Sequence, residues 1–119
     1  MEDFAPYELA VKLKKKGFNW RIGYAYGNKG EYMYTVTEYD VDYIPAPTIS
    51  QVLKWLRKEK NVFIEISITT SGYYSTVYSN IDLTLVNKTT YYQEYVGATN
   101  EDYNNCVLEA IEYVLDNLI

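Results

Sequence analysis

Residues 62–70 carry the stretch that decides the fold, Val-Phe-Ile-Glu-Ile-Ser-Ile-Thr-Thr. Aliphatic side chains occupy every second position from Val62 to Ile68, and aromatic or polar side chains fill the positions between them. Alternation with a period of two predicts a β-strand with one buried face. Because the strand has a single aliphatic face, we expect a second layer of structure to cover that face alone.

Two more strands are predicted on the C-terminal side of this stretch. Ser71-Gly72 predicts a tight turn, and strands are expected to follow over residues 73–86 and 89–96. Pairing across the Ser71-Gly72 turn places Ile66 opposite Val77. This register keeps the aliphatic side chains of both strands on one face.

The first helix is predicted over residues 5–16. Its apolar face consists of Leu9, Ala10 and Leu13. Gly17 suits the left-handed position just after a helix, and Phe18 can then fold back onto the last turn.

Two further helices are predicted from their capping residues and apolar faces. Thr48 and Gln51 have the spacing of a capping box, which predicts a helix from residue 49 to about residue 60, with Trp55 beside its apolar face. Thr99 is the expected N-cap of the last helix. The apolar face of that last helix is expected to contain Tyr103, Val107, Ala110, Ile111, Val114 and Leu118.

The first hairpin is predicted over residues 20–26 and 31–38. A two-residue turn would pair Tyr26 with Glu31, whereas a three-residue loop pairs Tyr26 with Tyr32 and gathers the apolar side chains on one face. We therefore expect the three-residue loop, with Gly30 in the left-handed conformation of a bulge.

The predicted order is helix, two strands, helix, three strands, helix, with residues 39–47 as a connecting loop. The predicted order shows no long crossover between parallel strands. The fold class is therefore expected to be α+β, with a five-stranded antiparallel sheet and three helices packed on one face. The length of 119 residues predicts a single globular domain over 1–119, and residues 5–45 and 46–86 suggest a loose duplication of a helix and two strands.

The composition favours binding over chemistry. Fifteen residues are tyrosine, which is common at interfaces, and none is histidine, the usual proton shuttle and metal ligand. The net charge of −5 argues against nucleic acid as the main partner. The single cysteine, Cys106, cannot form an internal disulfide, and the sequence shows no signal peptide and no membrane span. A cytoplasmic location is therefore expected.

A resemblance adds a biological setting. The segment from Ala46 to Arg57, followed by Ile64 and Ile66, resembles a family of small uncharacterised proteins from Bacteroidetes genomes and their phages and mobile elements. The Lys16-Gly17-Phe18 and Leu118-Ile119 ends of the outer helices extend this likeness, whereas Asn104-Asn105-Cys106 departs from it. The resemblance implies phage or mobile-element cargo and carries no known activity.

Three sets of residues could carry chemistry, and none has the partners that a catalytic or metal site needs. Cys106 lacks a histidine or cationic partner and lies on an acidic helix, which would raise its pKa. Asp40 and Asp42 lack the further oxygen ligands that a calcium loop needs. Acidic residues on the predicted sheet that could serve in glycoside hydrolysis are Glu65, Asp82 and Glu94. We expect no catalytic, cofactor or metal site and no enzymatic activity.

The lysines of the first two helices give the alternative function, nucleic-acid association. They form two runs, over residues 12–16 and 54–60. Sheet tyrosines could add base stacking to the phosphate contacts of these lysines. The competing interpretation is that the lysines complement helix dipoles and the acidic last helix.

The main candidate site is the face of residues 62–78 opposite the isoleucines. Alternation places Phe63, Tyr74, Thr76 and Tyr78 on this face. Aromatic side chains anchor interfaces because they bury a large area and lose little conformational freedom. Two interpretations stay open. The face is either a protein-binding or self-association surface, or an ordinary solvated sheet with cross-strand aromatic pairs.

Overall fold

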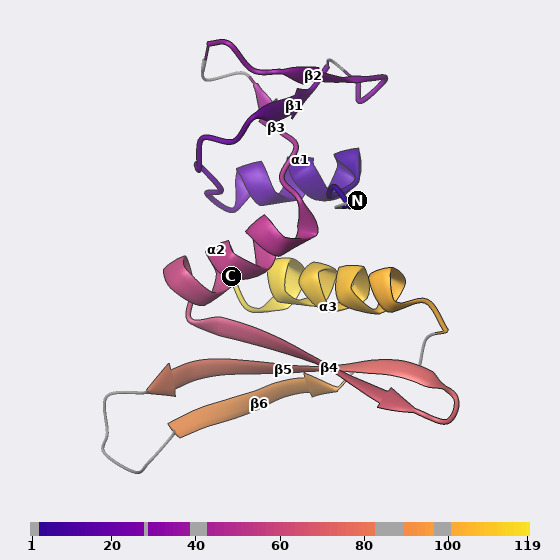
Figure 1. Cartoon of the computed structure of the whole chain (residues 1–119). Coiled ribbons are helices and arrows are strands. Elements are labelled where there is room, and N and C mark those ends of the chain that lie inside the picture. The colour runs from indigo at the N-terminus through magenta and orange to yellow at the C-terminus, as the bar shows by residue number, and fades with distance from the viewer. Residues whose placement is uncertain (1–2, 28, 39–42, 83–89, 97–100) are drawn as a thin grey trace. The chain divides into compact units, whose positions relative to one another are not determined.

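The computed structural model describes residues 3–27, 29–38, 43–82, 90–96 and 101–119 (Figure 1). It shows an α+β chain with three helices and two antiparallel sheets in these residues. Residues 1–52 and 53–119 form two compact units. The first two helices are each followed by an antiparallel pair of strands.

The strands form two sheets, so the predicted single five-stranded sheet is wrong. The sheet of the first unit has the order β2-β1-β3 and consists of β1 (Tyr24–Tyr26), β2 (Met33–Thr35) and β3 (Ile44–Pro45). Residues 39–47 were predicted to be a loop, but β3 within them pairs with β1 on the side away from β2. With β2 on one edge of β1 and β3 on the other, the first hairpin belongs to a three-stranded sheet that is separate from the sheet of the second unit.

Helix α1 (Tyr7–Lys15) ends as the sequence predicts. Gly17 has a φ of +99°, and the backbone N–H of Phe18 donates to the carbonyl oxygen of Leu13 at 2.9 Å. This bond, together with a bond from Gly17 N–H to Lys14 O at 3.1 Å, makes a Schellman motif. Phe18 is buried, so the chain leaves the helix with an aromatic ring in the core of the first unit.

The register of the first hairpin differs by one residue from the predicted register. Tyr26 lies opposite Met33 rather than Tyr32, and Ala25 lies opposite Tyr34. A shift of one residue moves a whole strand's side chains to the other face. Tyr32 and Tyr34 therefore do not share a face with Tyr26, contrary to the prediction.

The loop of this hairpin explains the shift. Gly27 N–H donates to Tyr32 O at 2.8 Å, which leaves four residues in the loop instead of three. A Cβ atom on Gly27 would lie 2.7 Å from the Tyr32 ring, so glycine lets this ring pack over the backbone. The predicted left-handed conformation of Gly30 is confirmed, with a φ of +74°.

Helix α2 (Ile49–Glu59) begins with the predicted capping box. Thr48 N–H donates to Gln51 Oε1 at 2.8 Å, and Gln51 N–H donates to Thr48 Oγ1 at 3.2 Å. Trp55 is fully buried, so it belongs to the core and does not lie beside it.

The sheet of the second unit has the order β4-β5-β6. Its strands are β4 (Val62–Thr69), β5 (Gly72–Asp82) and β6 (Thr90–Val96). Thr69 pairs with Gly72, so the turn is Thr70-Ser71, and Ile64 rather than Ile66 lies opposite Val77. This register is shifted by two residues from the prediction. An even shift leaves every side chain on its predicted face.

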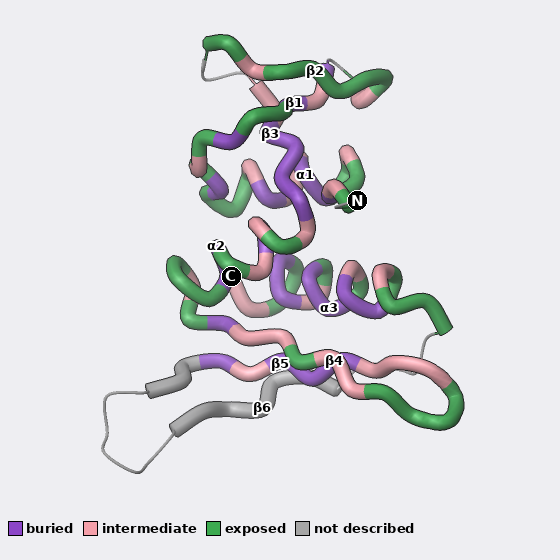
Figure 2. Tube along the Cα trace, viewed as in Figure 1, coloured by how far each residue is buried: buried purple, intermediate pink, exposed green. Residues whose placement is uncertain are grey.

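Helix α3 (Tyr103–Asn117) lies along one face of this sheet, in contact with β4 and β5 (Figure 1). Its N-cap is Asp102, whose carboxylate accepts N–H bonds from Asn104 at 2.8 Å and Asn105 at 3.3 Å. The predicted cap, Thr99, lies outside the described residues. Figure 2 shows a buried stripe along the helix, formed by Cys106, Val107, Ala110, Ile111, Val114 and Leu115.

Candidate functional site

The two faces of the second sheet differ in what covers them. On the isoleucine face, the rings of Tyr73 and Tyr103 meet edge to face at 5.4 Å, which joins β5 to α3. Ser75 and Val77 are buried on the same face. The cover ends before the hairpin turn, where Ile68 is 76% exposed. The predicted one-sided cover of this sheet is therefore confirmed for α3.

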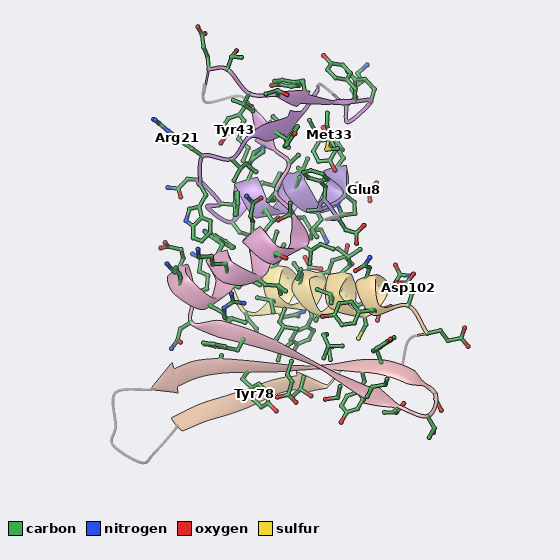
Figure 3. The ribbon with its side chains drawn as sticks, in the orientation of Figure 1. Glu8, Arg21, Met33, Tyr43, Tyr78 and Asp102 are labelled. Atoms are coloured by element: carbon green, nitrogen blue, oxygen red, sulfur yellow. The ribbon has the colours of Figure 1, made fainter. Side chains whose placement is uncertain are left out.

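The opposite face carries the aromatic residues that the sequence analysis selected. Phe63 and Tyr78 are directly opposite each other on β4 and β5, and Tyr74 lies on the same face four residues along β5. All three are partly exposed. Figure 3 shows Tyr78 on the side of the sheet away from α3. The structure thus brings Phe63 and Tyr78 together and places Tyr74 at the other end of the same face.

Thr76 occupies the position between the two tyrosines, and it is only 6% exposed. It lies on the central strand, with Glu65 of β4 and Val96 of β6 as its backbone partners. A short side chain at a central position lies below its longer neighbours. Thr76 therefore contributes spacing between the aromatic rings and little contact area.

Cys106 is buried on the sheet-facing side of α3. Burial raises the pKa of its thiol, the nearby Glu109 carboxylate raises it further, and a hydrogen bond with Ser75 lowers it. The net direction is upward, which disfavours the thiolate that a nucleophile or metal ligand requires. Cys106 is therefore placed as a packing residue.

The acidic candidates do not gather into a site in the described part of the chain. No group of three or more His, Cys, Asp or Glu residues there could hold a metal ion. Glu65 is exposed on the aromatic face of β4. Asp40 and Asp42, and the side chains of Asp82 and Glu94, lie outside what the structure describes.

Two of the helix lysines have partners within their own unit. Lys14 Nζ donates to the backbone oxygen of Tyr43 at 2.7 Å. Lys60 Nζ lies 5.5 Å from the centre of the Trp55 ring, within the range of a cation–π contact. These contacts favour a structural role for both lysines over phosphate binding.

A second aromatic surface, which was not predicted from the sequence, lies on the first hairpin. Tyr32 is 57% exposed, Met33 42% and Tyr34 39%, and the rings of Tyr32 and Tyr34 lie 6.1 Å apart. The predicted register would have placed both tyrosines with Tyr26, on the face that meets Tyr7 of α1. The two glycines that bracket the loop, Gly27 and Gly30, were the signal that a longer loop was available.

The helices were compared with the requirements of a membrane span, and the chain with known proteins. None of the helices in the described residues is long and apolar enough to cross a bilayer. No protein-family model, curated protein or solved structure matches this chain. Its function is therefore inferred from its own surfaces and core.

Proposed function

We propose that this chain is a non-enzymatic protein-binding module whose contact surface is the outer face of β4 and β5. The observation that carries the proposal is the division of the second sheet into two faces. Helix α3 packs on the aliphatic face, and Phe63, Tyr74 and Tyr78 lie partly exposed on the opposite face. The partner is a protein of the host or phage, or a second copy of the chain.

The physical chemistry of the outer face suits this role. Each aromatic ring buries a large area on contact, while its strand backbone already holds it in place, so binding costs little conformational freedom. Glu65 and Ser67 follow Phe63 on the same face of β4, with Ser67 opposite Tyr74, and these polar side chains keep the free surface hydrated. Ser67 Oγ donates to Glu65 Oε1 at 3.3 Å, which orders this polar strip.

The chemistry of the core supports binding rather than catalysis. The only thiol is buried with a raised pKa, and the chain has no histidine to activate a nucleophile. The single cysteine also supports a reducing compartment, and we place the protein in the cytoplasm on that ground. The resemblance of residues 46–66 to phage and mobile-element proteins is the basis for proposing such an origin.

A double substitution tests the proposal. Tyr74→Ala with Tyr78→Ala should leave the fold intact, because the α3-covered face is unchanged, and should abolish capture of the partner from a native lysate. The matched control, Tyr74→Phe with Tyr78→Phe, keeps the rings and should retain most of the binding. The captured protein is then purified and its affinity measured by calorimetry. Equal affinity for the alanine variant and the wild type would rule this surface out.

Nucleic acid is the rival partner for the same face. Its binding would weaken steeply with added salt, because phosphate contacts release counterions. Binding through aromatic rings should depend far less on salt. Fluorescence anisotropy with a labelled single-stranded oligonucleotide over a salt series separates the two. Salt-sensitive oligonucleotide binding that is lost in the alanine variant would replace the protein-binding proposal.

A further inference from the structure

The two edges of the first sheet are built differently. On the β3 edge, Pro45 lies opposite Ala25, while Ala46 N–H donates to Tyr24 O at 2.9 Å. Hydrogen-bonded and non-bonded pairs alternate along antiparallel strands, so the backbone nitrogen and carbonyl of Pro45 point away from β1. It has no N–H to offer another strand.

The chain beyond β3 is also paired. Ala5 N–H donates to Pro47 O at 2.8 Å, and Ile49 N–H donates to Asp3 O at 2.9 Å. These bonds and the bridge between Phe4 and Thr48 occupy the backbone just past β3. The β3 edge is therefore closed to a further strand.

Among the described residues, no strand pairs with the outer edge of β2. Gly27 N–H donates to Tyr32 O at 2.8 Å, and Val36 N–H donates to Gly23 O at 2.9 Å. By the same alternation, Tyr34 bonds to β1, whereas the N–H and C=O groups of Met33 and Thr35 point away from it. All three residues of β2 are exposed.

Strand β2 also lacks the features that usually protect an edge. It contains no proline and no lysine, and its pairing with β1 is regular throughout. Its exposed apolar side chains are Met33 on one face and Tyr34 on the other, where Tyr32 extends the surface by one residue. An open edge with apolar side chains is a template for another strand.

We propose that β2 is a self-association surface, on which a second copy of the chain pairs antiparallel through its own β2, with Tyr34 at the twofold axis. In this register Met33 faces the partner's Thr35, and Thr35 faces the partner's Met33. Both residues present their N–H and C=O groups outward, so each of these two pairs exchanges two hydrogen bonds. The two three-stranded sheets then become one continuous sheet.

A second copy fits this edge because the pattern around Tyr34 is self-complementary. Tyr34 meets the partner's Tyr34 at a non-hydrogen-bonded position, where facing side chains are closest and aromatic pairs stabilise. The same register places Tyr32 opposite the partner's Val36 at each end of the paired strands. No charged residue lies within the paired segment, residues 32–36, so no like charges face each other. A strand of unrelated sequence could form the backbone hydrogen bonds with β2 but would lack the pairing of Tyr34 with a second Tyr34.

A charge-swap experiment tests the inference. The wild type should show a reversible monomer–dimer equilibrium in sedimentation velocity over a range of concentrations. Tyr34→Glu and Tyr34→Lys each place like charges at the axis, and each should weaken self-association by about tenfold or more. Mixing the two variants places opposite charges at the axis and should restore the dimer. A wild type that stays monomeric, or variants that dimerise as well as the wild type, would overturn the proposal.

A cysteine substitution tests the register with a milder change. Tyr34→Cys should form a disulfide-linked dimer under mild oxidation, because the two thiols meet at the axis. The matched control, Tyr24→Cys, places an equally accessible thiol on β1, away from the axis, and Cys106 is buried in both variants. Equal cross-linking of the two variants, or none in Tyr34→Cys, would contradict the proposed pairing. The Tyr74/Tyr78 alanine variant should dimerise through β2 like the wild type if that face serves a different partner.

Discussion

The two hairpins of this protein differ in how a shift of register affects the faces on which their side chains lie. In the second hairpin the observed pairing is two residues from the predicted one, and the paired side chains of residues 62–69 and 72–79 still lie on their predicted faces. In the first hairpin the pairing is one residue away, and Tyr32 and Tyr34 change faces. An even shift alters neighbours along the strand, whereas an odd shift exchanges the buried and exposed sets.

The difference in strand length explains why the second hairpin was easier to predict. Strand β4 has eight residues with four aliphatic positions, which fixes its face whatever the turn does. Strands β1 and β2 have three residues each, so the loop decides the register. The conformation of the loop therefore decides which face of a short strand is buried, whereas the side-chain pattern of a long strand decides it directly.

The largest expected effect tests the role of the helix layer in the second unit. Ile111→Ala removes a fully buried side chain of α3 and should lower the free energy of unfolding by about 3 kcal/mol. Ile68→Ala, at the exposed end of the same sheet face, should change it by less than about 0.5 kcal/mol. Urea denaturation measures both. Similar losses in the two variants would show that the cover by α3 does not distinguish the ends of the sheet.

The next effect tests how far the first hairpin depends on its loop. Gly30→Val should destabilise by about 2 kcal/mol, because valine resists a positive φ and its Cβ would clash with the Tyr7 ring. Gly17→Val is the matched control, since Gly17 also has a positive φ but a Cβ atom there would meet no other atom within 4 Å. The excess of the first loss over the second measures the ring contact. Equal losses of stability in the two variants would show that the contact with the Tyr7 ring does not contribute.

A smaller effect concerns pH and the contact between the first hairpin and the N-terminal segment. The hydroxyl of Tyr26 donates to the backbone oxygen of Ala5, and burial raises the pKa of Tyr26. Tyr26→Phe should cost about 1 kcal/mol at neutral pH through the lost bond.

The raised pKa sets the sign of the pH dependence. The folded state holds the phenolic proton more tightly than the unfolded chain, whose tyrosines titrate near pH 10. This contribution is complete below about pH 10 and is lost as pH rises further, because the unfolded chain then binds fewer protons. The stability gap between wild type and Tyr26→Phe should therefore narrow above about pH 10. A gap that widens there would contradict the assignment.

The smallest expected effect concerns the partner-binding surface. Cys106→Ser changes a buried residue on the far side of the sheet from Phe63, Tyr74 and Tyr78. Any loss should appear in thermal stability, while the affinity for the captured partner stays unchanged. Loss of affinity in a fully folded Cys106→Ser variant would reopen a chemical role for the thiol.

Residues close together in the chain account for most of what was predicted. The capping box of Thr48 and Gln51 and the left-handed Gly17 were both confirmed. So was the burial of Val107 and Ile111 on the last helix. The cap of that helix was assigned to Thr99, although Asp102 fills the role three residues later. Both residue types make good caps, so residue type alone did not distinguish them.

The sequence by itself determined the three helices, the C-terminal end of the first, the cap of the second and the two-faced character of the 62–69 strand. These features depend on hydrogen bonds and side-chain spacing within a few residues, which the local sequence contains. Only the tertiary structure decided that the strands form two sheets, that Pro45 closes one edge of the first sheet, and that Tyr34 is exposed at the other. Strand edges compete for partners across the whole chain, and local sequence does not contain the outcome of that competition.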